Sequence, residues 1–115
     1  MATIAVTGGT GFVGGTVAAV LTAQGHDVVC LVRRDPGPEF PWATSVVAFD
    51  DVGRLAGLLE KADAVLHLAI MNDFHGMYAD RRAAYDGYVG LTRRVVDAAN
   101  LTDTLVGYVS TDWVF

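Results

Sequence analysis

Apolar residues gather in short runs that alternate with amphipathic segments along the chain. Residues 3–7 and 27–32 are rich in β-branched and other apolar residues, as is typical of strands buried in a parallel sheet. Between them, apolar positions recur at helical spacing from Val13 to Leu21, and Gly25 gives a stop signal. The pattern predicts a strand, a helix and a second strand in succession.

The same alternation continues after a segment that holds all three prolines, residues 34–42, which we expect to be a surface loop. Further strands are predicted at residues 45–49, 64–69 and 105–110, and a helix at 52–61. A longer helix is marked by Ala84, Tyr88, Leu91, Val95 and Ala99. Alternating strands and helices imply right-handed crossovers. The fold class predicted is α/β, a Rossmann-like doubly wound parallel sheet of five strands in the order 3-2-1-4-5.

Ligands of such sheets bind outside the carboxyl ends of the strands. We therefore expect a site formed by residues 7–14, 32–35, 69–75 and 110–115. Asn72, Asp73 and His75 fall in this region, but their spacing defines neither a metal site nor a catalytic triad.

The strongest chemical signal is the glycine-rich sequence between the first strand and the first helix, Thr7-Gly8-Gly9-Thr10-Gly11-Phe12-Val13-Gly14. Glycines there permit a tight turn, close approach of a diphosphate and contact between helix and sheet, while helix-end N–H groups face the anion. We interpret the turn as a dinucleotide cradle; the alternative is a purely structural turn. The expected cofactor-binding residues are Gly8, Thr10, Gly11, Phe12, Val13 and Gly14.

The end of the second strand selects the dinucleotide. An acid there would bond the 2′-hydroxyl of NAD, but this end is occupied by Val32. Arg33 and Arg34 follow, and their guanidinium groups suit a 2′-phosphate. We therefore expect NADP to be preferred over NAD. The alternatives are that the arginines are solvated, or that Asp35 turns inward and favours NAD.

Composition narrows the class of protein. A chain of 115 residues, 52% of them hydrophobic, fits one compact domain spanning residues 1–115. A net charge of -5 is a poor match for nucleic-acid phosphates. The single cysteine, Cys30, suits a reducing cytoplasm. The apolar run 64–71 is shorter than the ~20 residues of a membrane span. We expect a cytoplasmic protein with no membrane, nucleic-acid or metal partner.

Four arginines of the longer helix, Arg81, Arg82, Arg93 and Arg94, are candidates for phosphate binding. Asp86 and Asp97 each lie four residues from an arginine, a spacing typical of a solvated helix face. We assign these arginines to solvent-exposed positions.

With these motifs the chain resembles the extended short-chain dehydrogenase/reductases, the NAD-dependent epimerases and dehydratases of nucleotide sugars. Residues 7–14 are similar to the opening motif of that family, Phe49-Asp50 to its adenine-contacting segment, and His67-Leu68-Ala69 to the strand that lines the cofactor. Residues 110–115, Ser-Thr-Asp-Trp-Val-Phe, look most like the dTDP-4-dehydrorhamnose reductases.

The resemblance implies roles for individual residues. Thr111 aligns with the catalytic hydroxyl that bonds the substrate oxygen, Asp50 with the adenine contact, and Leu68 and Ala69 with the cofactor wall. Each role has a structural alternative: Thr111 as a strand-end hydroxyl bonded to backbone, and Asp50 as the cap of the helix that begins near Val52. Two further residues stay open: His67 is more typical of a satisfied core histidine than of a catalyst, and Asp112 either contacts the sugar or is solvated.

One family feature is missing. The Tyr-x-x-x-Lys pair is not found: the residues four positions after the tyrosines are Arg82, Val89, Thr92 and Asp112. In related proteins the pair follows the fifth strand. The apolar strand at 105–110 would also be an exposed edge. We therefore expect the chain to be the amino-terminal part of a longer enzyme, truncated after strand five and inactive alone.

The resemblance implies an oxidoreductase that transfers hydride between NADP or NAD and a nucleotide-linked sugar, of the 4-keto-sugar reductase type. Its ligands would be the dinucleotide and a nucleotide-sugar, and a homodimer is compatible with it. The first alternative is an epimerase or dehydratase with tightly bound NAD. The second is a non-catalytic NAD(P)-binding sensor.

Overall fold

A computed structural model describes residues 1–69 and 79–109 of the chain. In the described residues, none of the helices is long and apolar enough to cross a membrane. The elements in chain order are β1 (Thr3–Thr7), α1 (Phe12–Ala23), β2 (Asp27–Val32), β3 (Ala43–Val46), α2 (Val52–Leu59), β4 (Ala64–His67), α4 (Arg81–Tyr85), the π-helical turn η1 (Asp86–Gly90), α5 (Leu91–Thr102) and β5 (Leu105–Tyr108).

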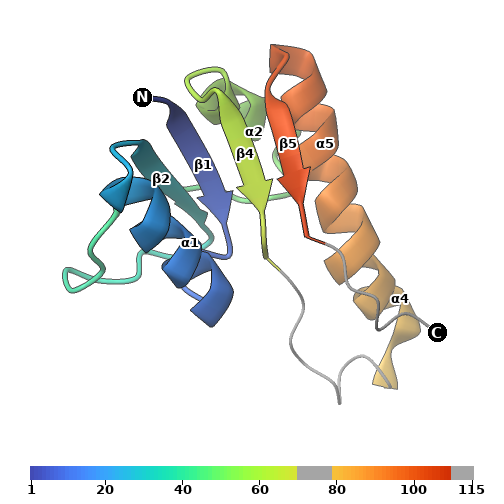
Figure 1. Cartoon of the computed structure of the whole chain (residues 1–115). Helices are drawn as coiled ribbons and strands as arrows, with labels where there is room; N and C mark the ends of the chain where they lie inside the picture. Colours follow the sequence, from blue (N-terminus) through green and yellow to red (C-terminus); the bar gives the residue numbers. More distant parts are fainter. Residues whose placement is uncertain (70–78, 110–115) are drawn as a thin grey trace.

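The strands form one five-stranded sheet in the order β3-β2-β1-β4-β5, and every neighbouring pair is parallel. The predicted doubly wound α/β fold and its strand order are confirmed. Figure 1 shows β1, β4 and β5 running in the same direction, so their carboxyl ends share one edge. The register pairs Thr7 of β1 with Leu31 on one side and with His67 on the other. The segments after these three residues therefore start at the same level.

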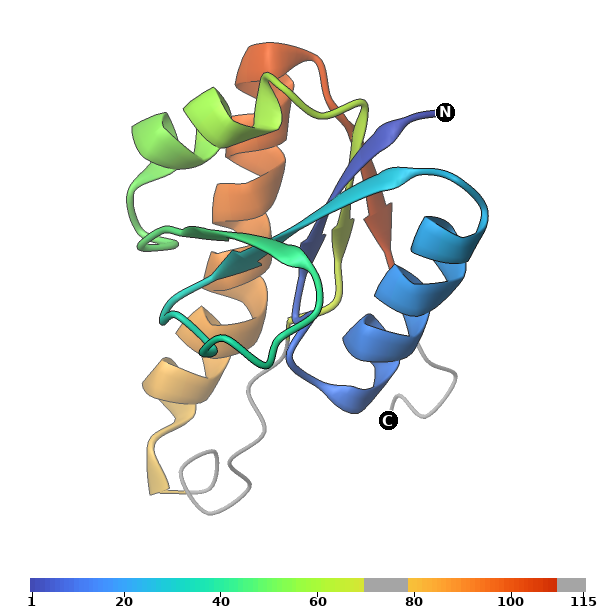
Figure 2. The ribbon, with the colours of Figure 1, turned by 90° about the vertical axis from the view of Figure 1, so that its left-hand side faces the viewer.

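Helices cover both faces of the sheet. Figure 2 shows α1 on one face and α2 with α5 on the other. The core beneath α2 and α5 is built from Leu31, Leu55, Leu59, Val65 and Val95, which are 0–2% exposed. On the face of α1, the buried residues are Val6, Cys30 and Val32, and the aromatic rings of Phe40 and Trp42 pack against them from the proline-rich loop.

Three strands end earlier than predicted, and one of them is β5, which ends at Tyr108 although the prediction extended it to residue 110. β3 occupies Ala43–Val46 instead of 45–49, because its pairing with β2 runs only from Val29↔Ala43 to Val32↔Val46, and the chain then turns toward α2. β4 ends at His67 instead of at residue 69. The amides of the next two residues both donate to the hydroxyl of Thr7, and the Leu68 amide also donates to the Thr7 carbonyl oxygen at 3.2 Å.

The long helix predicted around residues 84–99 is interrupted by the π-helical turn η1. The carboxylate of Asp86 passes over Gly90, and its Oδ1 atom lies 2.6 Å from a guanidinium nitrogen of Arg94. A Cβ at position 90 would overlap this carboxylate, so the contact across the wider turn requires glycine there. Among the described residues, Asp86 thus pairs with an arginine eight positions away and not with Arg82 at helical spacing. The assignment of the arginines to exposed positions is confirmed for Arg81, Arg82 and Arg93, whereas the side chain of Arg94 is only 30% exposed.

Replacement of Leu59 by alanine tests the packing of α2. Leu59 is fully buried, whereas Leu101 on α5 is 70% exposed. We expect Leu59→Ala to lower the free energy of unfolding by about 2–5 kcal/mol, because a cavity remains where the side chain packed. Leu101→Ala is the matched control and should change it by less than about 0.5 kcal/mol. Urea unfolding followed by circular dichroism measures both, and equal losses would contradict this core.

Candidate functional site

A cleft of about 890 Å³ opens at the carboxyl ends of the strands, between the start of α1 and the segments that follow β2 and β4. It is lined by residues 8–14 and 31–36, and by Phe49, Leu68 and Ala69. The structure thus brings together ten of the residues predicted from the sequence: Gly8, Thr10, Gly11, Phe12, Val13, Gly14, Arg33, Arg34, Leu68 and Ala69.

The glycine-rich turn is packed backbone against backbone. Gly8 has φ +77°, and a Cβ on it would lie 2.7 Å from the amide nitrogen of Ala69. A Cβ on Gly14 would overlap the carbonyl oxygen of Gly8. The turn is closed by the amide of Gly11, which donates to that same carbonyl at 3.0 Å. Only glycine at positions 8 and 14 lets α1 start this close to β1 and β4.

The amino-terminal end of α1 faces the cleft without a side-chain cap. Its N-cap residue is Gly11, which has no side chain to accept from the first amides, and the first turn contains no acidic residue. The first-turn residues Phe12 and Val13 are 90% and 56% exposed. Uncapped amides and the helix dipole make this end attractive to an anion.

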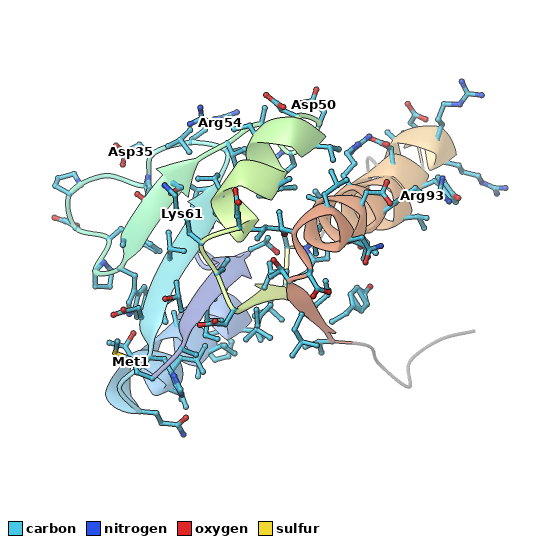
Figure 3. The ribbon with its side chains drawn as sticks, turned by 90° about the horizontal axis from the view of Figure 1, so that it is seen from above. Met1, Asp35, Asp50, Arg54, Lys61 and Arg93 are labelled. Carbon is cyan, nitrogen blue, oxygen red and sulfur yellow. The ribbon has the colours of Figure 1, made fainter. Side chains whose placement is uncertain are left out.

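Two arginines and an aspartate form the wall after β2. Arg33 and Arg34 are exposed and line the cleft. The Oδ1 atom of Asp35 accepts from the amide of Gly37 at 2.9 Å, so this carboxylate is engaged in its own loop. Figure 3 shows Asp35 on the loop at the outer side of the sheet. In the part of the chain that the structure describes, neither Arg33 nor Arg34 has a carboxylate within ion-pair distance.

Asp50 is exposed and does not line the cleft, whereas its neighbour Phe49 does. The sequence alternative in which Asp50 caps α2 is wrong: the cap is Asp51, whose Oδ1 atom accepts from the amide of Arg54 at 3.0 Å. Figure 3 shows Asp50 beside the start of α2. Its contact with adenine stays a prediction.

A buried polar chain beneath the cleft is a feature that sequence reasoning missed. The Oγ1 atom of Thr7 lies 3.0 Å from the amide of Leu68, 3.1 Å from the amide of Ala69 and 2.7 Å from Nδ1 of His67. The Nε2 atom of His67 lies 3.1 Å from Oγ1 of Thr92 on α5. His67 is 3% exposed, which confirms its interpretation as a satisfied core histidine. The available signal was a threonine that ends one strand and a histidine that ends its neighbour.

Donor counting fixes the tautomer of His67. The amides of Leu68 and Ala69 only donate, so each directs its hydrogen at a lone pair of the Thr7 hydroxyl, and the Leu68 amide shares its hydrogen with the Thr7 carbonyl oxygen at 3.2 Å. The proton of that hydroxyl is then donated to Nδ1, which must be unprotonated, and Nε2 carries the hydrogen that faces Thr92. Burial lowers the pKa of His67 below 6.5, which favours the same neutral form.

Comparison with known proteins places this geometry in a family. The chain matches the NAD dependent epimerase/dehydratase family over residues 4–115. The chain belongs to that family. This confirms the resemblance at the level of the family, and the glycine-rich turn that suggested it is the turn that lines the cleft.

Several members and structural relatives are similar to this epimerase/dehydratase chain. It is 38% identical over 104 residues to dTDP-6-deoxy-L-talose 4-dehydrogenase (NAD(P)(+)) of Kitasatospora kifunensis, covering 84% of this chain and 30% of the relative. UDP-glucose 4-epimerase of Brucella ovis in complex with NAD is 29% identical, with a TM-score of 0.82 and coverage of 94% and 35%. A short-chain dehydrogenase/reductase superfamily protein of Agrobacterium tumefaciens with bound NAD is 31% identical, with a TM-score of 0.77 and coverage of 95% and 32%.

The chain spans about a third of the length of these relatives. Some predicted site residues lie outside the part of the chain that the structure describes: Thr111 and Asp112, and the loop residues Asn72, Asp73 and His75. Within the described part, no group of three or more His, Cys, Asp or Glu side chains is arranged to hold a metal ion.

Alanine substitutions at two glycines separate the packing of the turn from general glycine effects. Gly8→Ala would force a Cβ to within 2.7 Å of backbone atoms at a positive φ, so we expect a loss of more than about 2 kcal/mol in the free energy of unfolding. Gly57→Ala is the control, because no atom lies within 4 Å of its Cβ position on α2. It should stabilise the chain by about 0.5–1 kcal/mol. Urea unfolding that moves both variants in one direction would contradict the close packing.

Stability should depend on pH through His67. Because its pKa is lower in the folded chain than its ordinary 6.5, the unfolded chain takes up the proton first as the pH falls. The free energy of unfolding is therefore unaffected by His67 at pH well above 6.5 and decreases as the pH is lowered through that value. Urea midpoints on both sides of it measure the decrease. His67→Asn should show a smaller decrease, and Leu101→Ala, at an exposed position of α5, the full one.

Proposed function

We propose that the chain is the dinucleotide-binding part of an NAD(P)-dependent oxidoreductase that acts on a nucleotide-linked sugar. The observation that carries this proposal is the cleft at the strand ends, where the uncapped start of α1 meets a turn that only glycine can form. Solved relatives from Brucella ovis and Agrobacterium tumefaciens are described with bound NAD, which supports a dinucleotide as the ligand.

Each part of the cleft suits one part of a dinucleotide. The amides at the start of α1, together with Gly8, Thr10 and Gly11, would hold the diphosphate, and Gly14 lets α1 pack against the carbonyl of Gly8 so that these amides reach it. Phe12 and Val13 would cover it on the exposed side, and Leu68 and Ala69 would form the wall after β4. Asp50 would contact the adenine. When bound, the dinucleotide supplies hydride transfer at the nicotinamide, and the protein supplies position.

The wall after β2 favours NADP over NAD. Arg33 and Arg34 lie at the cleft, and the nearby carboxylate of Asp35 is bonded to the amide of Gly37. A 2′-phosphate would gain charge-assisted hydrogen bonds from these arginines. The 2′-hydroxyl of NAD would need a carboxylate acceptor, and the carboxylate of Asp35 is bonded within its own loop. The name of the Kitasatospora kifunensis relative includes both NAD and NADP, which is compatible with such a site.

The reaction we propose is of the 4-keto-sugar reductase type. The support is the 38% identical relative, a dehydrogenase named for position 4 of a dTDP-linked deoxysugar. Thr111 would bond the substrate oxygen beside the reacting carbon, and the Tyr-x-x-x-Lys pair would follow in a longer chain. The second candidate is a nucleotide-sugar epimerase with bound NAD, favoured by the Brucella ovis relative.

Fluorescence titration with NADPH and NADH tests the cofactor proposal. We expect saturable binding of both, with NADPH bound more tightly. Replacing Arg33 and Arg34 together by glutamine should weaken NADPH about tenfold or more and leave NADH nearly unchanged, because only the 2′-phosphate loses its charged partners. Arg93→Gln is the matched control on α5, outside the cleft, and should change neither affinity (Figure 3).

Gly11→Asp provides the second arm of the titration. A carboxylate at the N-cap of α1 would face the diphosphate and compete for the same amides, so binding of both dinucleotides should be lost. An unfolded variant is recognised by circular dichroism. A folded wild-type chain that binds neither dinucleotide contradicts the proposed function.

A further inference from the structure

The polar chain Thr7–His67–Thr92 links the cleft to the helix on the opposite face of the sheet. Thr7 is the last residue of β1, His67 the last of β4 and Thr92 the second of α5. Thr7 and His67 are register partners, so their side chains point to the same face. Thr7 is fully buried, and His67 is 3% exposed. No buried side-chain polar atom in the described residues lacks a hydrogen-bond partner.

The hydroxyl of Thr7 also holds the floor of the cleft. It accepts from the amides of Leu68 and Ala69, the two residues that leave β4 and line the cleft. Gly8 rests directly on the peptide between them, since a Cβ there would lie 2.7 Å from both the carbonyl carbon of Leu68 and the amide nitrogen of Ala69. Gly14 rests in turn on the carbonyl of Gly8. The Leu68–Ala69 peptide therefore supports Gly8, and Gly8 supports the start of α1 at Gly14.

We propose that His67 is a positioning residue for the dinucleotide cleft: in its Nε2–H form it orients the Thr7 hydroxyl so that this holds Leu68 and Ala69 under the glycine-rich turn, and its protonation weakens dinucleotide binding. This inference rests on the proposed dinucleotide function of the same cleft. It assigns His67 no contact with the dinucleotide or with the reacting atoms.

Protonation would break the chain at Thr7. With a hydrogen on Nδ1, the imidazolium would face an oxygen whose two lone pairs already accept amides, so the hydroxyl would have to release one of them. Released from the hydroxyl, the Leu68 amide would keep the Thr7 carbonyl oxygen at 3.2 Å, whereas the Ala69 amide would lose its acceptor. The groups recorded against the ring come from three elements: Thr7 of β1, Thr92 of α5 and the ring of Tyr108 of β5, whose centroid is 5.9 Å away. Of these, only Tyr108 has an ionisable side chain, and within residues 1–69 and 79–109 no carboxylate lies within ion-pair distance of the ring to stabilise a positive charge.

The wild-type chain alone permits two measurements. The imidazole nitrogen chemical shifts should show the Nε2–H tautomer at neutral pH, and a titration midpoint below 6.5. The dissociation constant of NADH should rise as the pH falls through the same midpoint. NADH is the probe because a phosphomonoester such as the 2′-phosphate of NADPH itself titrates at about pH 6.

Variants separate the hydrogen bonds from mere packing. Thr7→Ser keeps the hydroxyl and should bind NADH within about twofold of wild type. Thr7→Val removes the acceptor of the Ala69 amide and leaves the Leu68 amide with the Thr7 carbonyl oxygen alone, so it should weaken binding about tenfold. His67→Asn retains an acceptor for Thr7 without a titrating group, so its NADH affinity should no longer vary over this pH range. His26→Gln, at the opposite end of the sheet, should keep the wild-type pH dependence.

The outcomes are distinguishable. An Nδ1–H tautomer, or an NADH affinity that is unchanged by pH and by Thr7→Val, overturns the positioning role and leaves the proposed function standing. A folded wild-type chain that binds no NADH at any pH overturns both. If Thr7→Val fails to fold, the tautomer and the wild-type pH dependence still decide.

Discussion

The close approach of backbone to backbone at the β1–α1 turn is the constraint on which the rest of the structure depends. The peptide after β4 supports Gly8, and Gly8 supports the first turn of α1 through Gly14. A methyl group at either glycine would push the helix away from the sheet and close or distort the cleft. The same contact leaves the start of α1 uncapped and directed at the cleft, so packing and anion attraction arise from one arrangement.

The polar chain beneath this turn is compatible with burial because its donors and acceptors match. Thr7 has three neighbours and three hydrogen-bonding positions, and His67 presents one acceptor and one donor to two hydroxyls. A charged imidazole would disturb that count. Buried polar groups are stable only while each of them keeps its hydrogen bonds. The hydrogen-bonded set of Thr7, His67 and Thr92 therefore links the protonation of His67 to the geometry of β1 and β4.

Much of the fold was predictable because local signals agreed. The apolar runs placed the strands, Gly25 marked the end of α1, and the strand–turn–helix context placed residues 8–14 and Arg33 and Arg34 at one edge of the sheet. The misassigned features depend on specific pairings and side-chain contacts that the pattern of apolar positions does not show. The end of β3 is set by its register with β2, the cap of α2 by Asp51 instead of its neighbour, and the π-helical turn by the passage of Asp86 over Gly90. The hydroxyl of Thr7 acts on residues about sixty positions away, which no local pattern reveals.

The single cysteine, Cys30, is a chemical probe for opening of the glycine-rich turn. Cys30 is fully buried under Gly9, where a Cβ would lie 2.6 Å from its sulfur, and burial raises the pKa of the thiol. An alkylating reagent therefore reaches this sulfur only when the glycine-rich turn or the proline-rich loop that carries Phe40 and Trp42 moves away, or when the chain unfolds. Since the chain has no other thiol, the rate of alkylation reports how often these covering segments open.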